Sequence, residues 1–92
     1  MGSELSNRRK RLVYRSAYTG TKETDLLLGY FAEHNIATLT EEQLDEYEKL
    51  LEIEDPRLYK WITGMEKAPK EYQSNVLNLI KNFKLSDYLI DK

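Results

Sequence analysis

The sequence predicts an all-α fold, a compact five-helix bundle forming a single domain over residues 1–92. Three observations favour it: apolar residues recur at helical spacing, no segment alternates as a strand does, and capping residues divide the chain into five segments. With 92 residues, 40% of them hydrophobic and 33% charged, the chain can enclose one small core. We expect an ordered part from about residue 7 to residue 84, with flexible residues before it and after residue 85.

The first predicted helix covers residues 7–17, and a glycine separates it from the second. Its N-cap is Ser6 or Asn7, because either side chain can accept a hydrogen bond from the first turn. Gly20 ends the segment or lies in the turn, where glycine readily adopts a positive φ angle. The residues expected to face inward are Leu12 with either Val13 or Tyr14.

The second predicted helix covers residues 22–34. Thr21 is its expected N-cap, because a threonine hydroxyl can accept a hydrogen bond from a free N–H group of the first turn. Asn35 suits the left-handed position that often ends a helix. The buried stripe of this helix is expected to be Leu27, Leu28 and Phe31.

The third helix has the clearest start. Thr40 and Gln43 have the spacing of a capping box, and Glu41 and Glu42 complement the positive end of the helix dipole. Its expected inner face is Leu44, Tyr47, Leu50 and Leu51. Acidic residues fill its other positions and the following turn, where we expect a solvated face rather than a catalytic pair of carboxylates. They are Glu41, Glu42, Asp45, Glu46, Glu48, Glu52, Glu54 and Asp55.

The last two helices follow prolines. Asp55 as N-cap and Pro56 at the first helical position predict the fourth helix, which ends near Gly64. Its expected apolar face is Leu58, Trp61, Ile62 and Met65, with the indole N–H of Trp61 reaching the surface. The fifth helix follows Pro69, with an expected apolar face of Tyr72, Val76, Leu79, Ile80 and Phe83. From Ser86 onward we expect a turn or a frayed end.

The composition excludes several classes of function. The chain has no cysteine and a single histidine, His34, so we expect no metal site and take His34 as an exposed residue at a helix end. No serine or threonine has a base and an orienting acid near it in the sequence, so we expect no enzyme activity. The net charge of −2 argues against nucleic-acid binding, and no apolar run reaches the roughly 20 residues of a membrane-spanning helix.

Two features near the first helix suggest protein docking. The basic run at residues 8–11 is either a frayed, solvated turn or a group that steers an acidic partner. Tyr14 and Tyr18 are four residues apart, a spacing that predicts one aromatic ridge on the first helix, for which core packing and interface contact are equally expected. Three further tyrosines lie on or beside apolar stripes and are expected in or at the edge of the core: Tyr47, Tyr59 and Tyr72.

The sequence resembles the succinate dehydrogenase assembly factors that promote covalent attachment of FAD to the flavoprotein subunit. The resemblance covers roughly residues 8–83 and rests on several motifs in order. They are Arg-Leu-Val-Tyr-Arg-Ser at 11–16, Gly-Thr-Lys-Glu at 20–23, Asp-Leu-Leu-Leu at 25–28, Leu-Thr-Glu-Glu-Gln-Leu at 39–44 and Asp-Pro-Arg-Leu-Tyr-Lys-Trp at 55–61. Members of this family are small five-helix bundles, in agreement with the fold expected from the residues alone.

The signature of that family is Arg-Gly-x-x-Glu at the junction between the first two helices. Gly20 and Glu23 occupy the glycine and glutamate positions, whereas Thr19 stands where the family has arginine. A threonine hydroxyl cannot make the bidentate contacts of a guanidinium group, and neither Arg15 nor Lys22 would reproduce that geometry.

The resemblance implies a docking protein that holds its partner in a conformation competent for flavinylation. The bond forms between the flavin and a histidine of the partner, so the chain supplies no nucleophile and binds no cofactor of its own; FAD belongs to the partner. The expected partner contacts lie in and beside the helix junction: Arg11, Tyr14, Arg15, Tyr18, Thr19, Gly20, Lys22, Glu23 and Asp25.

The partner implied is the flavoprotein subunit of succinate dehydrogenase, or that of fumarate reductase. We expect a protein that is monomeric when free, does not insert into membranes, and lies in the cytoplasm of a bacterium or the mitochondrial matrix of a eukaryote. The alternative is a non-enzymatic adaptor with the same bundle and no flavoprotein partner. A helix-turn-helix DNA-binding protein is disfavoured because the third helix is acidic.

Overall fold

Five α-helices make up most of residues 2–53 and 56–83, the part of the chain that this computed structural model describes. They are α1 (Gly2–Ser16), α2 (Lys22–Asn35), α3 (Glu41–Leu51), α4 (Arg57–Thr63) and α5 (Asn75–Asn82), with short 3-10 helices η1 (Ile36–Thr38) and η2 (Lys70–Tyr72). Within those residues there is no β-strand, so the predicted all-α fold of five helices is confirmed.

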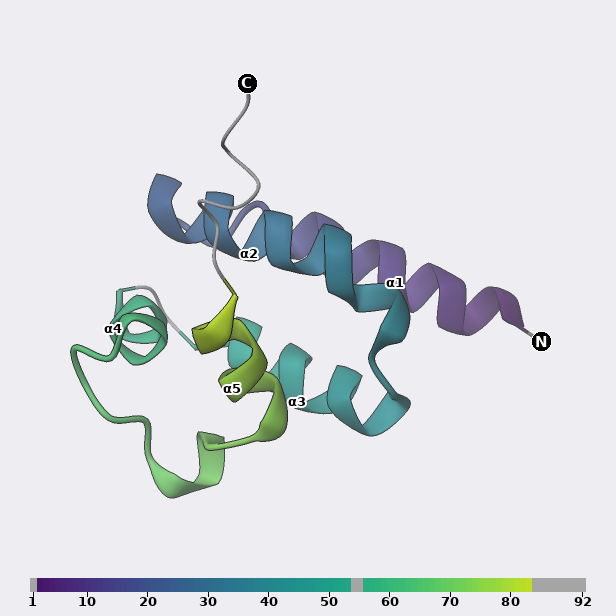
Figure 1. The fold of residues 1–92 in the computed structure, drawn as a ribbon. Coiled ribbons are helices and arrows are strands. Elements are labelled where there is room, and N and C mark those ends of the chain that lie inside the picture. Colours follow the sequence, from purple (N-terminus) through teal and green to yellow (C-terminus); the bar gives the residue numbers. More distant parts are fainter. Residues whose placement is uncertain (1, 54–55, 84–92) are drawn as a thin grey trace.

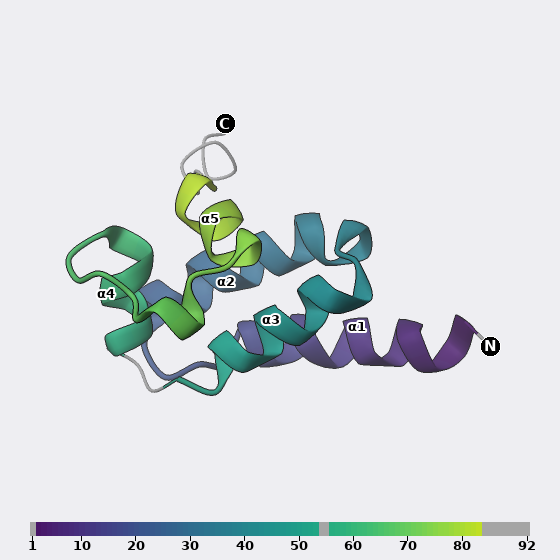
Figure 2. The same ribbon diagram turned by 90° about the horizontal axis from the view of Figure 1, so that it is seen from below.

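The helices form two layers. The two longest, α1 and α2, lie side by side and run in opposite directions, and α3, α4 and α5 lie beneath them (Figure 1). Seen from below, α3 lies along α1 and α5 crosses next to it, while α4 lies at the end of the bundle where α1 passes into α2 (Figure 2). The junction between α1 and α2 is therefore at one end of the molecule.

The core lies between these two layers and is continuous across all five helices. Phe31 of α2 is at its centre, with ring centroids 5.7 Å from Tyr47 of α3 and 5.6 Å from Phe83. Most of the other buried residues are aliphatic: Leu12, Leu28, Ile36, Leu39, Leu44, Leu50, Leu58, Ile62, Val76, Leu77 and Ile80. Such side chains provide the main driving force for folding.

One buried hydrogen-bonded chain ties the end of α1 to α3. The hydroxyl of Ser16 donates to the carbonyl oxygen of Leu12 at 2.6 Å, so it accepts a hydrogen bond from the hydroxyl of Tyr47. Ser16 and Tyr47 are both fully buried, and burial raises the pKa of the Tyr47 hydroxyl well above its ordinary value. The position of the last turn of α1 is thus fixed from inside the core.

Several helix ends follow the predicted local chemistry. Thr21 caps α2 by accepting from the N–H of Thr24, and Thr40 and Gln43 form the complete capping box of α3. Gly64 ends α4 in the left-handed conformation, with φ of 82°. In each case the signal lies within a few residues of the helix end that it determines.

The predicted limits of the first two helices were wrong in two places. α1 begins at Gly2 rather than after Ser6 or Asn7, because Leu5 packs on the core and Glu4 is favourable in the first turn. Asn35 does not adopt the left-handed conformation: its φ is −125°, and its side chain donates to the carbonyl oxygen of Phe31 while the chain continues into η1.

The starts of the last two helices also differ from expectation. Pro56 is the N-cap of α4 rather than its first residue, and its carbonyl oxygen accepts from Lys60 at 3.0 Å. Ser74 caps α5 by accepting from the N–H of Leu77, so α5 begins well after Pro69 and residues 70–72 form η2 instead. Glu54, Asp55 and the predicted turn from Ser86 lie outside the described residues.

These shifts change which side chains are buried. Leu77 is buried and Leu79 is 44% exposed, because α5 has a different register from the predicted one. Met65 follows the end of α4 and is exposed, so it is not part of the apolar face. Trp61 is buried as predicted, but its indole N–H does not reach the surface and has no hydrogen-bond partner among the described residues. Leu27 and Leu51 are half-buried at the edge of the core.

Candidate functional site

The junction between α1 and α2, residues 17–25, is a tight and well hydrogen-bonded turn; we call it the joint. At its start, the N–H groups of Ala17 and Tyr18 donate to carbonyl oxygens of the last turn of α1, each at 3.1 Å. Gly20 has φ of 139°, in the region that favours glycine, so the predicted role of this residue in the turn is confirmed. α2 then begins directly after Thr21.

Asp25 gathers the hydrogen bonds of the joint. Its Oδ1 accepts from the backbone N–H of Thr19, from the Thr19 hydroxyl at 2.7 Å and from the N–H of Gly20 at 3.2 Å. These donors, chiefly the Thr19 hydroxyl, lower the pKa of the Asp25 carboxyl group from its ordinary value. Thr19 and Asp25, both expected to contact the partner, therefore contact each other.

The lowered pKa of Asp25 predicts a stability change in acid. The ionised carboxylate stabilises the folded state above its unfolded pKa of about 3.9, and this stabilisation is lost as the pH falls through the lower folded value. An NMR titration of the Asp25 carboxyl carbon should give a midpoint below that of a free aspartate. A midpoint at or above the free value would contradict the hydrogen bonding described for the joint.

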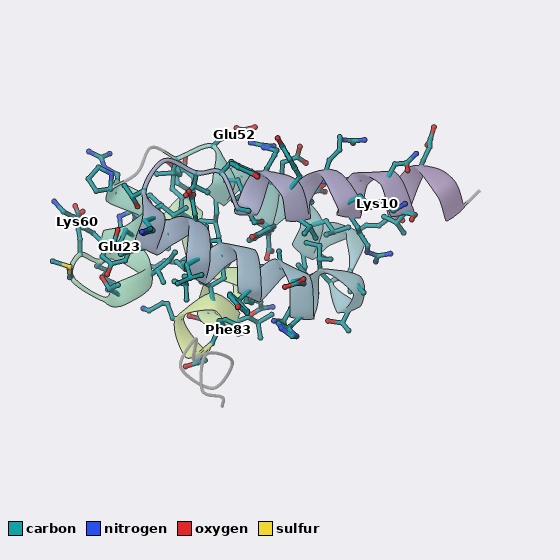
Figure 3. The ribbon with its side chains drawn as sticks, turned by 90° about the horizontal axis from the view of Figure 1, so that it is seen from above. Lys10, Glu23, Glu52, Lys60 and Phe83 are labelled. Atoms are coloured by element: carbon teal, nitrogen blue, oxygen red, sulfur yellow. The ribbon has the colours of Figure 1, made fainter. Side chains whose placement is uncertain are left out.

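Glu23 lies on the outer side of the same turn. It is exposed, and its side chain makes no hydrogen bond or ion pair with any described residue; the same holds for the side chain of its neighbour Lys22. The next residue, Thr24, is fully buried and thereby fixes the rotation of this first turn of α2. Glu23 projects at the end of the bundle where α4 also lies, far along the molecule from Lys10 (Figure 3).

Tyr14, on the outer side of α1, and Tyr18, in the joint just past the end of that helix, form the predicted aromatic ridge; we call this pair the tyrosine ridge. Their ring centroids are 4.7 Å apart with an interplanar angle of 36°, and each side chain is 68% exposed. Of the two expectations for these residues, core packing is therefore wrong. Two neighbouring aromatic rings exposed to solvent provide the kind of apolar group that anchors protein interfaces.

The basic run is divided between internal contacts and solvent. Arg8 donates to Asp45 at 2.6 Å and to Glu48 at 2.9 Å, and Arg9 donates to the carbonyl oxygens of Ile36 and Leu39. The prediction of a frayed turn was thus wrong, because both arginines hold α1 against the helices beside it. The acidic face of α3 was predicted to be solvated, but two of its acids, Asp45 and Glu48, form ion pairs with Arg8 of α1.

Arg11 and Arg15 lie on the side of α1 that carries the tyrosine ridge. Arg15 is half-exposed, and its guanidinium group lies 3.6 Å from the carboxylate of Glu48. Arg11 is exposed and has no ion pair among the described residues. Arg11 and Tyr14 lie on one face of α1 that points away from the core, and the ring of Tyr18 extends this face just past the end of the helix. The structure thus brings Gly20, Lys22 and Glu23 together in the joint, next to this face.

Two kinds of feature, metal-binding clusters and membrane-spanning helices, are absent from the described part of the chain. Residues 2–53 and 56–83 contain no cluster of three or more histidine, cysteine, aspartate or glutamate side chains that could hold a metal ion. His34 is exposed at the end of α2, as predicted. In the same residues no helix is long and apolar enough to span a bilayer. What the described surface offers near the joint is a carboxylate, two aromatic rings and a cation.

Comparison of the sequence with known proteins finds one family and several relatives. The family described as "Flavinator of succinate dehydrogenase" matches residues 10–84. The chain is 42% identical over 87 residues to "Succinate dehydrogenase assembly factor 2, mitochondrial" of Dictyostelium discoideum, a match that covers 95% of this chain and 62% of that protein.

Two further relatives show the same similarity. The chain is 42% identical over 73 residues to "FAD assembly factor SdhE" of Acetobacter pasteurianus, covering 79% of this chain and 67% of the relative. It is 36% identical over 84 residues to "Succinate dehydrogenase assembly factor 2, mitochondrial" of Danio rerio, covering 89% and 53%. This chain thus spans only part of the length of each of these relatives, whereas each match covers most of the residues of this chain.

Proposed function

This chain belongs to the family described as flavinator of succinate dehydrogenase, and from that membership we propose that it promotes covalent attachment of FAD to the flavoprotein subunit of succinate dehydrogenase. The observation that carries the proposal is the family match over residues 10–84, which includes the whole joint and its free carboxylate, Glu23. The names of the relatives from Dictyostelium discoideum and Acetobacter pasteurianus support the same client and the same cofactor.

The chain acts by docking rather than by catalysis. It binds the flavoprotein through the joint and the tyrosine ridge, and holds the partner in a conformation competent for flavinylation. Gly20 has no side chain and allows the two backbones to approach closely. Glu23, an anion in the first turn of α2, meets a cationic or N–H group of the partner. The flavin and the partner form the bond between them; this chain binds no FAD of its own.

The same docking role suggests the client, the oligomeric state and the compartment of this chain. The first client is the succinate dehydrogenase flavoprotein, and the fumarate reductase flavoprotein is the second to test. We infer that the chain is a monomer before it meets the client. It works where the client matures, in the cytoplasm of a bacterium or the mitochondrial matrix of a eukaryote.

Covalent flavin on the client tests the proposed function directly. The succinate dehydrogenase flavoprotein of the source organism is expressed with and without this chain, and covalent FAD is read as flavin fluorescence of the denatured protein. We expect a clear increase in the presence of the chain. No increase, with both proteins folded and FAD supplied, would reject the flavinylation role and direct attention to an adaptor with another partner.

Replacing Glu23 by glutamine is expected to weaken client binding without unfolding the bundle. Hydrogen bonds to charged groups contribute about 1.5–3 kcal/mol, so the Kd should rise about tenfold or more. An exposed acid in a first turn contributes only about 0.3–1 kcal/mol to folding. Binding is measured by titration calorimetry and folding by thermal melting.

The matched control for this substitution is Glu33→Gln, which makes the same change on an exposed glutamate near the other end of α2. It should leave the Kd unchanged. If Glu23→Gln and Glu33→Gln weakened binding equally, the effect would come from net charge and the assignment of Glu23 to the docking surface would fail.

A further inference from the structure

Thr19 and Asp25 have a different role from Glu23, although all three lie in the joint. We propose that Thr19 and Asp25 are positioning residues: their hydrogen bonds hold the joint in the conformation that presents Glu23 to the client. The part of this inference that concerns the client rests on the proposed function. The part that concerns the joint rests on the geometry of residues 17–25 alone.

The turn needs these hydrogen bonds because its own backbone does not supply them. Ala17 and Tyr18 still donate to carbonyl oxygens of α1, but among the described residues the N–H groups of Thr19 and Gly20 have no carbonyl partner. Both donate to the Asp25 carboxylate instead. Gly20 has no side chain to restrict it, so without this acceptor the turn would have many accessible conformations.

Asp25 is suited to the task by its place in α2. It lies in the first turn of the helix, where an anion is favoured, and its own N–H donates to the carbonyl oxygen of Thr21 at 2.9 Å. Its backbone is thus part of the helix while its carboxylate reaches back to the turn. The Thr19 hydroxyl adds a third donor at 2.7 Å, which aligns the carboxylate with the two N–H groups.

The same contacts determine where Glu23 points. Glu23 lies between Thr21, the N-cap, and Thr24, which is fully buried. The core therefore fixes one side of this turn, and the bonds to Asp25 fix the chain that leads into it. The carboxylate of Asp25 accepts hydrogen bonds within the joint, whereas that of Glu23 accepts none from the described residues. Glu23 is therefore the carboxylate that is available to bind the client.

This division of roles predicts how the loss of the Thr19 hydroxyl acts. When a binding-competent conformation is only partly populated, the apparent affinity falls by the same fraction, although no contact with the partner has been removed. Loss of one hydrogen bond of this kind is expected to change the population about three- to tenfold. The overall fold should be unaffected, because Thr19 lies outside the core.

The test compares Thr19→Val, which removes the hydroxyl, with Thr19→Ser, which keeps it. The control is Thr38→Val, which removes a hydroxyl that donates to the carbonyl oxygen of Asn35 at 2.8 Å at the opposite end of α2. Three quantities are measured for each: the melting temperature, hydrogen exchange of the Thr19 and Gly20 amides by NMR, and the Kd for the flavoprotein.

We expect Thr19→Val to accelerate exchange at both amides about three- to tenfold and to raise the Kd by a similar factor, with the melting temperature lowered by only a few degrees because the core stays intact. Thr19→Ser should behave as the natural chain, as should Thr38→Val. The inference is overturned if Thr19→Val leaves amide exchange unchanged, or if Thr19→Ser is as impaired as Thr19→Val. If the natural chain fails to bind the flavoprotein, the proposed function fails, and amide exchange still decides whether Thr19 and Asp25 hold the joint.

Discussion

Replacing Tyr47 by alanine is expected to lower the melting temperature by at least about 12 °C. Truncating a buried aromatic residue to alanine costs about 3–5 kcal/mol, and each kcal/mol shifts the midpoint by about 4–8 °C in a domain of this size. Tyr47 is fully buried, packs against Phe31 and bonds to Ser16, so its loss opens the layer between α1, α2 and α3. Thermal and urea denaturation followed by circular dichroism measure the effect.

The matched variant is Tyr47→Phe, which keeps the ring and removes only the hydroxyl. Because Ser16 still donates to Leu12, we expect a loss of about 0.5–1.5 kcal/mol, that of one hydrogen bond. If Tyr47→Phe were as destabilising as Tyr47→Ala, the stability would come from the hydrogen-bonded chain rather than from packing. If neither variant were destabilised, Tyr47 would not be a core residue.

The sequence was sufficient to predict the features that depend on neighbouring residues. The capping box of Thr40 and Gln43, the N-cap Thr21 and the end of α4 at Gly64 are each decided within one turn of chain, and all three were predicted correctly. The five helices follow from the same local signals together with the apolar spacing. A five-helix, all-α fold was therefore accessible without knowledge of the tertiary contacts.

One of the failed predictions depended on contacts between distant segments. The start of α1 was placed too late because nothing near Arg8 in the sequence reveals its partners Asp45 and Glu48, far along the chain in α3. Arg9 likewise finds its carbonyl acceptors in the segment after α2. Positive charge near a helix start is locally unfavourable, and these tertiary contacts offset that penalty.

The candidate site was predictable in position but not in its internal organisation. The glycine and the first-turn acid marked Gly20 and Glu23, both of which lie exposed in the joint. The contact between Thr19 and Asp25 was missed, because both residues were assigned to the partner-facing surface. A signal existed: a threonine before a glycine and an aspartate in the next helix's first turn can close an internal hydrogen-bonded turn.

The organisation of α1 explains how one helix can serve both folding and docking. Arg8 and Arg9 are used to attach it to its neighbours, and Leu12 and Ser16 enter the core. Arg11 and the tyrosine ridge lie on the opposite side, which no described residue covers. Substitutions on that side can therefore change binding while the fold stays intact.

Replacing Tyr18 by alanine is expected to weaken binding of the flavoprotein about 30-fold. Aromatic anchors at interface centres contribute about 2 kcal/mol or more, and Tyr18 presents its exposed ring to a partner together with that of Tyr14. Stability should change by less than about 0.5 kcal/mol, because the side chain is exposed. Affinity is measured by titration calorimetry and stability by thermal melting.

Two comparisons separate an anchor from a merely exposed ring. Tyr18→Phe keeps the ring and should bind nearly as well as the natural chain, whereas Leu79→Ala, which truncates an exposed apolar residue on α5, should have no effect on binding. The double variant Tyr14→Ala/Tyr18→Ala should lose less affinity than the two single losses combined, because each ring supports the other. If Tyr18→Ala bound as tightly as the natural chain, the ring of Tyr18 would lie outside the contact with the client, and the docking surface would be limited to the rest of the joint.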